Sequence, residues 1–391
     1  MKFKTSQIAK HWIATKSDTT TTLTPEQSEA NTALLEIALS KVLLSENLVV
    51  FTGLGTSLCL LDPSNNKPIA PTMGDLWAKS QNQIANFNSI LTKVKQPQTK
   101  PGSYDEDIEL LLSRCQMFNA LSKSKEIEDF VSAVETLITE ECRFLDKLPK
   151  DHGLPVHESF LRKIARRSPR QPRARLFTTN YDLCFETAAA RAGFVIIDGF
   201  SHTNPQDFDG NYFSYDIVKR EGDNETPKYI SNVFQLLKLH GSVDWDRDKD
   251  GKVQRSANPK KPVIIYPRNG KFESSYDHPY LEMMSRFQSS LRQPNTGLLI
   301  IGFGFKDSHL VQPILSATRS NVSLKLAVVG PHYDSSPPVT IKQLESLIDE
   351  GDRRITLVSG KFEELTEAIP DLVAETEEEV HRGRTRRLIT P

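Results

Sequence analysis

The sequence is poor in features that would place it in a specialised class of protein. Its four cysteines lie far apart and form no CxxC pair: Cys59, Cys115, Cys142 and Cys184. This spacing predicts reduced, buried thiols and hence a cytoplasmic protein. The net charge of −1 gives no overall attraction to nucleic acid or to a membrane surface. Any basic binding site must therefore be local.

Long apolar runs are also missing. No run of about eighteen apolar residues occurs, and Met1 to Lys16 lacks the apolar core of a signal peptide. We therefore expect no membrane span. The chain has 391 residues, of which 38% are hydrophobic and 25% charged, as in ordinary globular proteins with more than one structural unit.

What the sequence does contain is an alternation of helix and strand patterns. Thr24-Pro-Glu-Gln27 is a capping box with Pro at the first helical position, and it predicts a helix to about Ser45. Short apolar runs that follow predict buried strands: Leu48–Thr52, Ala174–Thr179, Phe194–Ile197, Leu236–Leu239, Val263–Tyr266, Leu298–Ile301, Leu324–Val329 and Ile355–Val358. Helical stretches lie between several of them: Asp182–Ala192, Pro279–Leu291 and Ser308–Thr318. This order predicts an α/β fold with a Rossmann-like, doubly wound, mostly parallel sheet.

Composition suggests where this fold is interrupted. Residues 74–167 are dominated by long amphipathic segments, which predict an α-helical insertion. The sheet domain is then expected over 25–73 and 168–370. The Thr-rich stretch near residues 16–23 predicts a flexible N-terminal arm over 1–24. Residues 371–391, which change from acidic to basic, are expected to form a solvated tail rather than a docking peptide.

Polar or glycine-rich turns follow several predicted strands. Gly53-Leu54-Gly55-Thr56-Ser57 follows the first strand and is either a phosphate-binding loop or a structural turn. Thr178-Thr179-Asn180-Tyr181-Asp182 ends the next one, where Asn180 or Asp182 would also suit a helix cap. Ligands bind at this edge of open α/β sheets.

Two further turns lie at the same expected edge. Lys238-Leu-His240-Gly-Ser242 brings a histidine that can accept a proton near neutral pH, although a lone histidine is often structural. Gly302-Phe-Gly304-Phe-Lys-Asp307 offers another close backbone approach and a polar helix start. Several such turns at one edge indicate a binding site.

The order of these motifs resembles that of the sirtuin superfamily. The family has a GAGxS loop, an Asn-bearing TQNxD turn, a His in an HG pair and a later glycine-rich strand end. Here the matching segments are Gly53–Ser57, Thr178–Asp182, His240-Gly241 and Gly302–Asp307. Leu54 stands where Ala is usual, and Thr179 and Tyr181 replace the usual neighbours of the Asn. The resemblance implies a Rossmann-like fold and NAD as substrate.

The resemblance also implies roles for single residues. Asn180 and His240 would be catalytic. Contacts to NAD would come from Gly53, Leu54, Gly55, Thr56, Ser57, Thr179, Asp182, Gly302, Gly304, Asp307 and Gly330, with Asp182 ordering the Asn180 turn. The two CxxC pairs of the family's zinc module are missing, so neither zinc nor protein deacetylation is expected.

Without the zinc module, the chain looks like the sirtuin-type NADases of bacterial anti-phage defence. In these enzymes a helical insert replaces the module and water replaces acyl-lysine as the nucleophile. The nearest type is the stand-alone subunit that assembles with a HerA-type hexameric ATPase, so we expect that partner and a homo-oligomer. Two alternatives stay open: a catalytically silent NAD or ADP-ribose sensor, and a protein deacylase or ADP-ribosyltransferase.

A dense basic run from Arg162 to Arg175 raises the question of nucleic-acid binding. The run lacks interleaved aromatic residues and carries Pro169 and Pro172. We therefore expect a solvated or partner-facing loop and no direct nucleic-acid binding.

Overall fold

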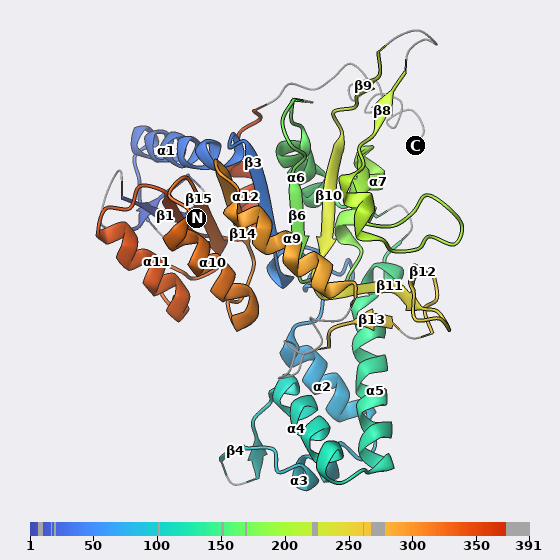
Figure 1. Ribbon diagram of the computed structural model, residues 1–391. Helices are drawn as coiled ribbons and strands as arrows, with labels where there is room; N and C mark the ends of the chain where they lie inside the picture. Colours follow the sequence, from blue (N-terminus) through green and yellow to red (C-terminus); the bar gives the residue numbers. More distant parts are fainter. Residues whose placement is uncertain are drawn as a thin grey trace.

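The computed structural model describes all residues except 7–10, 17, 19–20, 101, 150–151, 169, 221–225, 261, 267–277 and 373–391. The expected tail therefore lies almost wholly outside the described residues. Within the described part, the largest sheet has nine strands in the order β2-β1-β16-β15-β14-β3-β6-β10-β7 (Figure 1). Neighbours from β16 to β7 run parallel, and β1 and β2 run antiparallel at one edge. The strands are β1 (Lys2–Thr5), β2 (Ile13–Ala14), β3 (Asn47–Thr52), β6 (Arg175–Thr178), β7 (Val195–Ile197), β10 (Val233–Lys238), β14 (Thr296–Ile301), β15 (Lys325–Gly330) and β16 (Ile355–Ser359).

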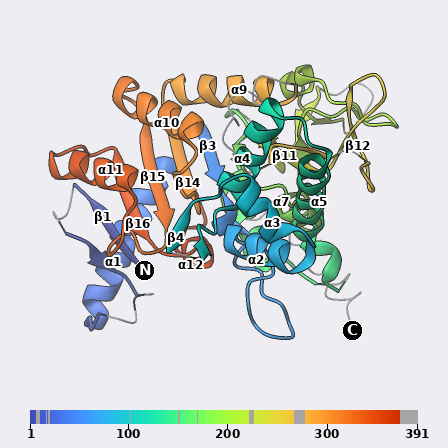
Figure 2. The ribbon, with the colours of Figure 1, turned by 90° about the horizontal axis from the view of Figure 1, so that it is seen from below.

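Helices cover both faces of this sheet, as the view from below shows (Figure 2). Val49 and Phe51 of β3 point to one face, and Leu48 and Val50 point to the other, because side chains alternate along a strand. The first face packs against α9 (Tyr280–Arg292), α10 (Ser308–Ser320) and α11 (Val339–Asp349). The second packs against α1 (Pro25–Leu43), α6 (Pro155–Ala165), α7 (Cys184–Ala192) and α12 (Phe362–Ala368). The predicted doubly wound, mostly parallel sheet is confirmed.

A group of helices between β3 and β6 has a core of its own and lies below the sheet in Figure 1. It comprises α2 (Met73–Gln83), α3 (Phe87–Lys93), α4 (Ile108–Leu121) and α5 (Lys125–Cys142), with the short strands β4 (Gln98–Lys100) and β5 (Ser103–Tyr104). At its centre Phe87 packs edge-to-face against Trp77 and at a tilt against Phe130. Helix α6, which we placed in the insertion, instead packs against α7 and α12. The helical group therefore ends before α6. In the part of the chain that is described, no helix is long and apolar enough to cross a membrane.

The expected flexible arm over residues 1–24 is wrong for its described strands. Lys2–Thr5 forms β1, which pairs with β16, and Phe3 is fully buried. Lys4 is also buried, and its ammonium binds Glu345 and Asp349 of α11. The Thr-rich composition that suggested an arm begins only after these residues.

Val263–Tyr266 was expected to join the parallel sheet. The strand there, β13 (Pro262–Ile264), instead pairs antiparallel with β11 (Gly241–Arg247) in a separate sheet with β12 (Val253–Arg255). The chain turns sharply at Gly241, which has φ +82°. The chain thus leaves the main sheet directly after His240. A further hairpin joins β8 (Val218–Lys219) and β9 (Lys228–Tyr229).

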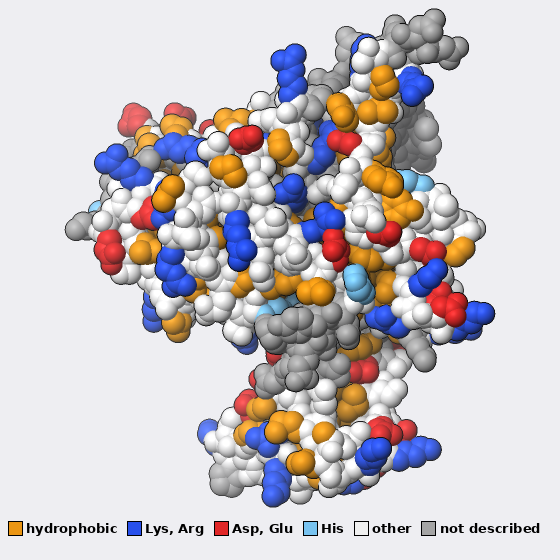
Figure 3. Space-filling view, in the orientation of Figure 1, with side chains coloured by type: hydrophobic (Ala, Val, Ile, Leu, Met, Phe, Trp, Pro, Cys, Tyr) orange, Lys and Arg blue, Asp and Glu red, His pale blue; other side chains and the backbone are white. Residues whose placement is uncertain are grey.

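Part of the basic run is not the solvated or partner-facing loop that we expected. Lys163 donates to the carbonyls of Thr366 and Ile369 at the end of α12. The buried Arg167 donates to the carbonyls of Leu43 and Ser45 at the end of α1. Cations bind helix C-termini because the last carbonyls lack partners there. Much of this positive charge thus stabilises the fold, and the face in Figure 3 shows basic and acidic side chains interspersed.

Candidate functional site

The predicted motifs meet at one edge because the strands that carry them end in register. Thr52 of β3 is paired with Ile301 of β14 and Thr178 of β6, and Thr178 is paired with Lys238 of β10. Parallel strands therefore deliver the Gly53, Thr179 and Gly302 turns side by side. Asn180 and His240 each lie two residues beyond the paired Thr178 and Lys238. The two predicted catalytic residues thus follow neighbouring strands at equivalent positions.

The two glycine-rich loops contact each other directly. Gly55 donates its amide to the carbonyl of Gly302 at 3.0 Å. A Cβ on Gly55 would lie 2.5 Å from the Cα of Gly302, and one on Gly302 would lie 2.6 Å from the Cα of Gly55. Gly302 also has φ +61°. Only glycine fits at such a contact.

This contact changes the explanation of the first loop. Within Gly53–Ser57, the amides of Gly53, Gly55, Thr56 and Ser57 are all bonded to carbonyls of the protein. Leu54 begins the short 3-10 helix Leu54–Thr56. The predicted phosphate contacts require backbone amides that are free to bind a ligand, but these four amides are bonded within the protein. The close contact between Gly55 and Gly302 gives a structural reason for glycine in the loop. Phosphate binding by this loop stays a prediction.

Asn180 is held by the first loop rather than acting as a helix cap. Its side-chain nitrogen donates to the carbonyl of Gly53 at 3.1 Å, to Thr56 Oγ1 at 3.2 Å and to Ser57 Oγ at 2.9 Å. The side chain is 8% exposed, and those of Thr56 and Ser57 are fully buried. Both hydroxyls therefore serve to orient Asn180 in this structure.

Asp182 supports the same arrangement from the other side. Its Oδ2 accepts from Ser57 Oγ at 2.7 Å, and its Oδ1 accepts from the amide of Cys184 at the start of α7. Thr179 continues the sheet, since its amide donates to the carbonyl of Thr52. Asp182 thus links the glycine loop, the Asn180 turn and the next helix, as expected of a residue that orders the turn.

His240 is 4% exposed and lies at the point where the chain leaves the sheet. Its carbonyl accepts from the amide of Ile265, and its ring stacks on that of His309, with centroids 5.7 Å apart. His309 belongs to the first turn of α10. The histidine pair therefore joins the β10 turn to the turn after β14.

The remaining predicted residues have different surroundings. Asp307 takes the N-cap position of α10, where its carbonyl accepts from Leu310. Gly330 gives room to the ring of Tyr333, because a Cβ there would lie 2.4 Å from that ring. Gly304 is exposed, and a Cβ on it would meet nothing within 4 Å. The structure thus gives no packing reason for a glycine at 304.

Lys238 and His309 contact residues of the predicted site, although the sequence patterns predict no role for either. Lys238 is 3% exposed, and its ammonium contacts the Asn180 turn. A signal was available, because Lys238 is a charge between the apolar residues Leu237 and Leu239 in a predicted buried strand. A buried charge in such a place needs partners. His309 had no comparable signal, since its contact with His240 depends on the tertiary fold.

A third histidine, His157 of α6, is fully buried beside the glycine loop. Its ring packs against Phe185 and Phe362, and its Nδ1 lies 4.0 Å from Cys59 Sγ. Burial lowers the pKa of His157 to about 4, and burial raises the pKa of the Cys59 thiol to about 12. At neutral pH both groups are uncharged, so this pair does not form a reactive thiolate.

We predict that His157 makes the protein sensitive to acid. In the unfolded chain His157 binds a proton as the pH falls through about 6.5, whereas in the folded protein it binds one only near pH 4. Stability from neutral His157 is complete above pH 6.5 and is lost as the pH falls toward 4. The loss should be about 3 kcal/mol, measured as the free energy of urea unfolding.

A variant isolates this effect from that of other groups. Between pH 6.5 and 4, the free energy of unfolding of His157→Leu should decrease less than that of the wild-type protein. His202→Leu, at an exposed position, is the matched control and should keep the wild-type slope. Equal slopes for His157→Leu and wild type would contradict the prediction.

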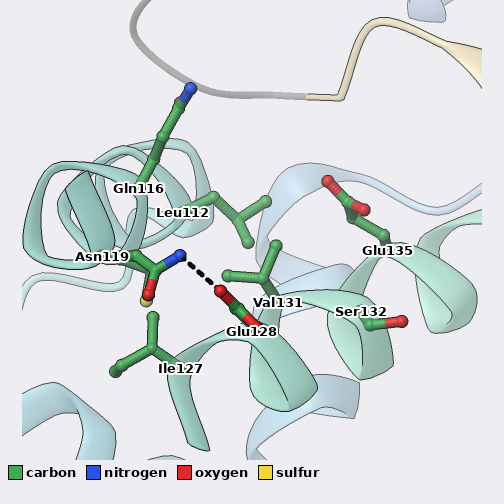
Figure 4. A pocket seen from close by; sticks show the side chains of 9 residues that line it. Leu112, Gln116, Asn119, Ile127, Glu128, Val131, Ser132 and Glu135 are labelled. Atoms are coloured by element: carbon green, nitrogen blue, oxygen red, sulfur yellow. Dashed lines mark hydrogen bonds between the residues drawn. The ribbon is translucent and has the colours of Figure 1, made fainter. Parts of the chain in front are cut away.

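Surface pockets also lie outside the predicted motifs. One lies between α4 and α5, where Leu112, Ile127 and Val131 form an apolar floor and Asn119 binds Glu128 (Figure 4). A second is lined by Ile197, Tyr212 and Tyr215 beside β7.

Among the described residues, no group of three His, Cys, Asp or Glu side chains is arranged to hold a metal ion. All four cysteines are free thiols; Cys115 and Cys184 are buried, as predicted, whereas Cys59 and Cys142 are half-buried.

The comparison with protein families agrees with this arrangement. Residues 174–343 match the family model of the SIR2-like domain. This range includes Asn180, His240 and the turn after β14, but not the loop Gly53–Ser57. No curated protein matches the chain. Residues 174–343 are therefore similar to a SIR2-like domain, a type of domain that uses NAD.

Proposed function

We propose that the protein is an NAD glycohydrolase, which cleaves NAD to nicotinamide and ADP-ribose. The observation that carries this proposal is the placement of Asn180 and His240 at equivalent positions after neighbouring parallel strands. An amide and an imidazole at the carboxyl edge of an α/β sheet lie where such folds bind nucleotides. The SIR2-like domain adds support for NAD as the substrate.

The contacts of Asn180 indicate which of its atoms serves the substrate. The carbonyl of Gly53 can only accept a hydrogen bond, so the nitrogen of the Asn180 amide must face the loop. The oxygen Oδ1 is then turned away from the loop. We propose that Oδ1 accepts a hydrogen bond from the attacking water or from a hydroxyl of the nicotinamide ribose.

His240 completes the reaction as a proton acceptor. The bond between ribose C1′ and the nicotinamide nitrogen breaks, and its electron pair leaves with neutral nicotinamide. Water adds to C1′, and its proton passes to the imidazole of His240 and then to solvent. The products are nicotinamide, ADP-ribose and one proton. Because nicotinamide leaves as a neutral molecule, the main task of the protein is to position the reactants.

Release of nicotinamide from NAD tests this proposal. Wild-type protein should release nicotinamide and ADP-ribose in equal amounts, measured by liquid chromatography. His240→Ala should lower kcat by about 10²-fold, which is the usual contribution of a general base. His202→Leu serves as a control at an exposed position. Full activity of His240→Ala would contradict the assignment of His240 as the proton acceptor.

The same measurement separates the alternatives. A protein that binds NAD but never releases nicotinamide would be a sensor. Release that depends on added acyl-lysine peptide would indicate a deacylase, and transfer of ADP-ribose to protein would indicate a transferase.

We further propose that the protein depletes NAD during anti-phage defence, as a homo-oligomer in complex with a HerA-type hexameric ATPase. This part rests on the resemblance of the motifs and on the lack of a CxxC zinc module. Co-expression with such an ATPase from the same genome should give a complex on size-exclusion chromatography. Elution of the two proteins as separate species, with unchanged turnover, would contradict this partnership.

A further inference from the structure

Lys238 is a buried cation in strand β10, which lies between β6 and the edge strand β7. It is 3% exposed and lies two residues before His240. Burying an ammonium group is costly unless oxygen atoms replace the lost water. The identity of those oxygens therefore shows what the charge does.

Four oxygens surround the ammonium of Lys238, and they come from two sides. Lys238 Nζ donates to the main-chain carbonyls of Tyr181 at 3.3 Å and Asp182 at 2.5 Å, directly after Asn180. It also donates to Glu186 Oε1 of α7 at 2.9 Å and to Ser242 Oγ at 2.8 Å. Ser242 lies two residues after His240. One cation thus joins the turn that carries Asn180 to the strand that carries His240.

The network continues beyond Ser242 to the small sheet. Ser242 Oγ donates to Asp244 Oδ1 at 2.5 Å, and Arg255 Nε lies 3.4 Å from Asp244 Oδ2. Arg255 also pairs with Asp198. Burial raises the pKa of Glu186, and the nearby Lys238 opposes this shift. Opposite charges therefore alternate from α7 to β12, and these contacts hold the ammonium of Lys238 in place.

We propose that Lys238 is a positioning residue that sets the placement of Asn180 relative to His240. This inference rests on the proposed NAD glycohydrolase function. The bonds to the Tyr181 and Asp182 carbonyls are the essential ones, because they hold the backbone of the Asn180 turn. The pair with Glu186 balances the charge. A purely structural ion pair would need only the second of these interactions.

A double substitution separates the two roles. Lys238→Met alone leaves the half-buried Glu186 without its cation, so the protein should lose stability. Lys238→Met with Glu186→Leu removes both charges and should recover most of the melting temperature. The bonds to the Tyr181 and Asp182 carbonyls stay missing in this double variant. We expect its kcat to remain about 10²-fold below that of wild type, with KM for NAD changed far less.

Lys4→Met is the matched control. Lys4 is 4% exposed and is paired with Glu345 and Asp349, but it lies in β1 and contacts none of the predicted site residues. Lys4→Met should lower the melting temperature and leave kcat unchanged.

Recovery of both stability and kcat in the double variant would overturn the positioning role. A failure of the proposed function looks different, because wild-type protein would then release no nicotinamide under any condition. In that case a crystal structure of the double variant decides the question. A displaced Asn180 turn supports positioning by Lys238, whereas an unmoved turn overturns it.

Discussion

Gly241→Ala should destabilise the protein by about 4 kcal/mol or more, measured as the free energy of urea unfolding. Gly241 has φ +82°, and a Cβ there would lie 1.9 Å from the carbonyl oxygen of Val263. This neighbour is backbone of the paired strand β13, so it cannot rotate away as a side chain could. The main chain must shift, and the shift acts on the adjacent His240. Any folded Gly241→Ala protein should therefore also lose activity.

Gly251→Ala is the control for backbone strain alone. Gly251 has φ +84°, but nothing lies within 4 Å of the position of its Cβ. It should cost only about 1 kcal/mol, since the left-handed conformation is the only penalty. The difference between the two variants then measures the steric clash. Equal losses would show that strain, rather than the contact with Val263, explains the glycine at 241.

The strands and the turns that follow them were predictable, because local sequence patterns encode both. A short apolar run such as Leu48–Thr52, followed by Gly53, predicts a buried strand and a turn wherever the chain folds. Parallel pairing then brings such turns to one edge of the sheet. The placement of Asn180 and His240 at the same edge followed from this pairing. The structure confirms the sheet on which this reasoning depended.

The contacts within the edge were not predictable, because they depend on residues far apart in the sequence. Gly55 and Gly302 touch through backbone atoms, which no sequence pattern expresses. Thr56 and Ser57 suited a phosphate as well as they suit the amide of Asn180. The prediction for Arg167 was wrong, because a helix end that needs a cation becomes visible only after folding. Charged residues in a run therefore need separate interpretation.

Asn180→Asp tests the orientation of the catalytic amide. It keeps the shape and one oxygen atom of the side chain, but it replaces the donating NH2 group with a second oxygen and adds a negative charge. A carboxylate oxygen would then face the carbonyl of Gly53, which also only accepts. The side chain must rotate away, and Oδ1 loses its placement toward the substrate. We expect kcat/KM for NAD to fall by about 10³-fold at pH 7, a loss typical of a misplaced polar group in an active site.

The pH dependence of this variant distinguishes lost orientation from other causes. A protonated carboxyl group is again a donor, so it can restore the bond to Gly53. Burial beside another acceptor raises the pKa of such a group and brings protonation closer to neutral pH. The activity of Asn180→Asp relative to wild type should therefore rise as the pH falls from 8 to 5.

Asn321→Asp provides the matched control for the loss of a donor. The amide of Asn321 also donates to two carbonyls, those of Leu291 and Gln293, but it lies at the end of α10, away from the catalytic edge. That variant should lose stability while kcat/KM stays at the wild-type level. If Asn180→Asp retained wild-type activity at pH 7, the amide nitrogen would not be what orients Asn180. The proposed orientation of Oδ1 by the glycine loop would then fail, because an oxygen of the side chain would reach the substrate without the bond to Gly53.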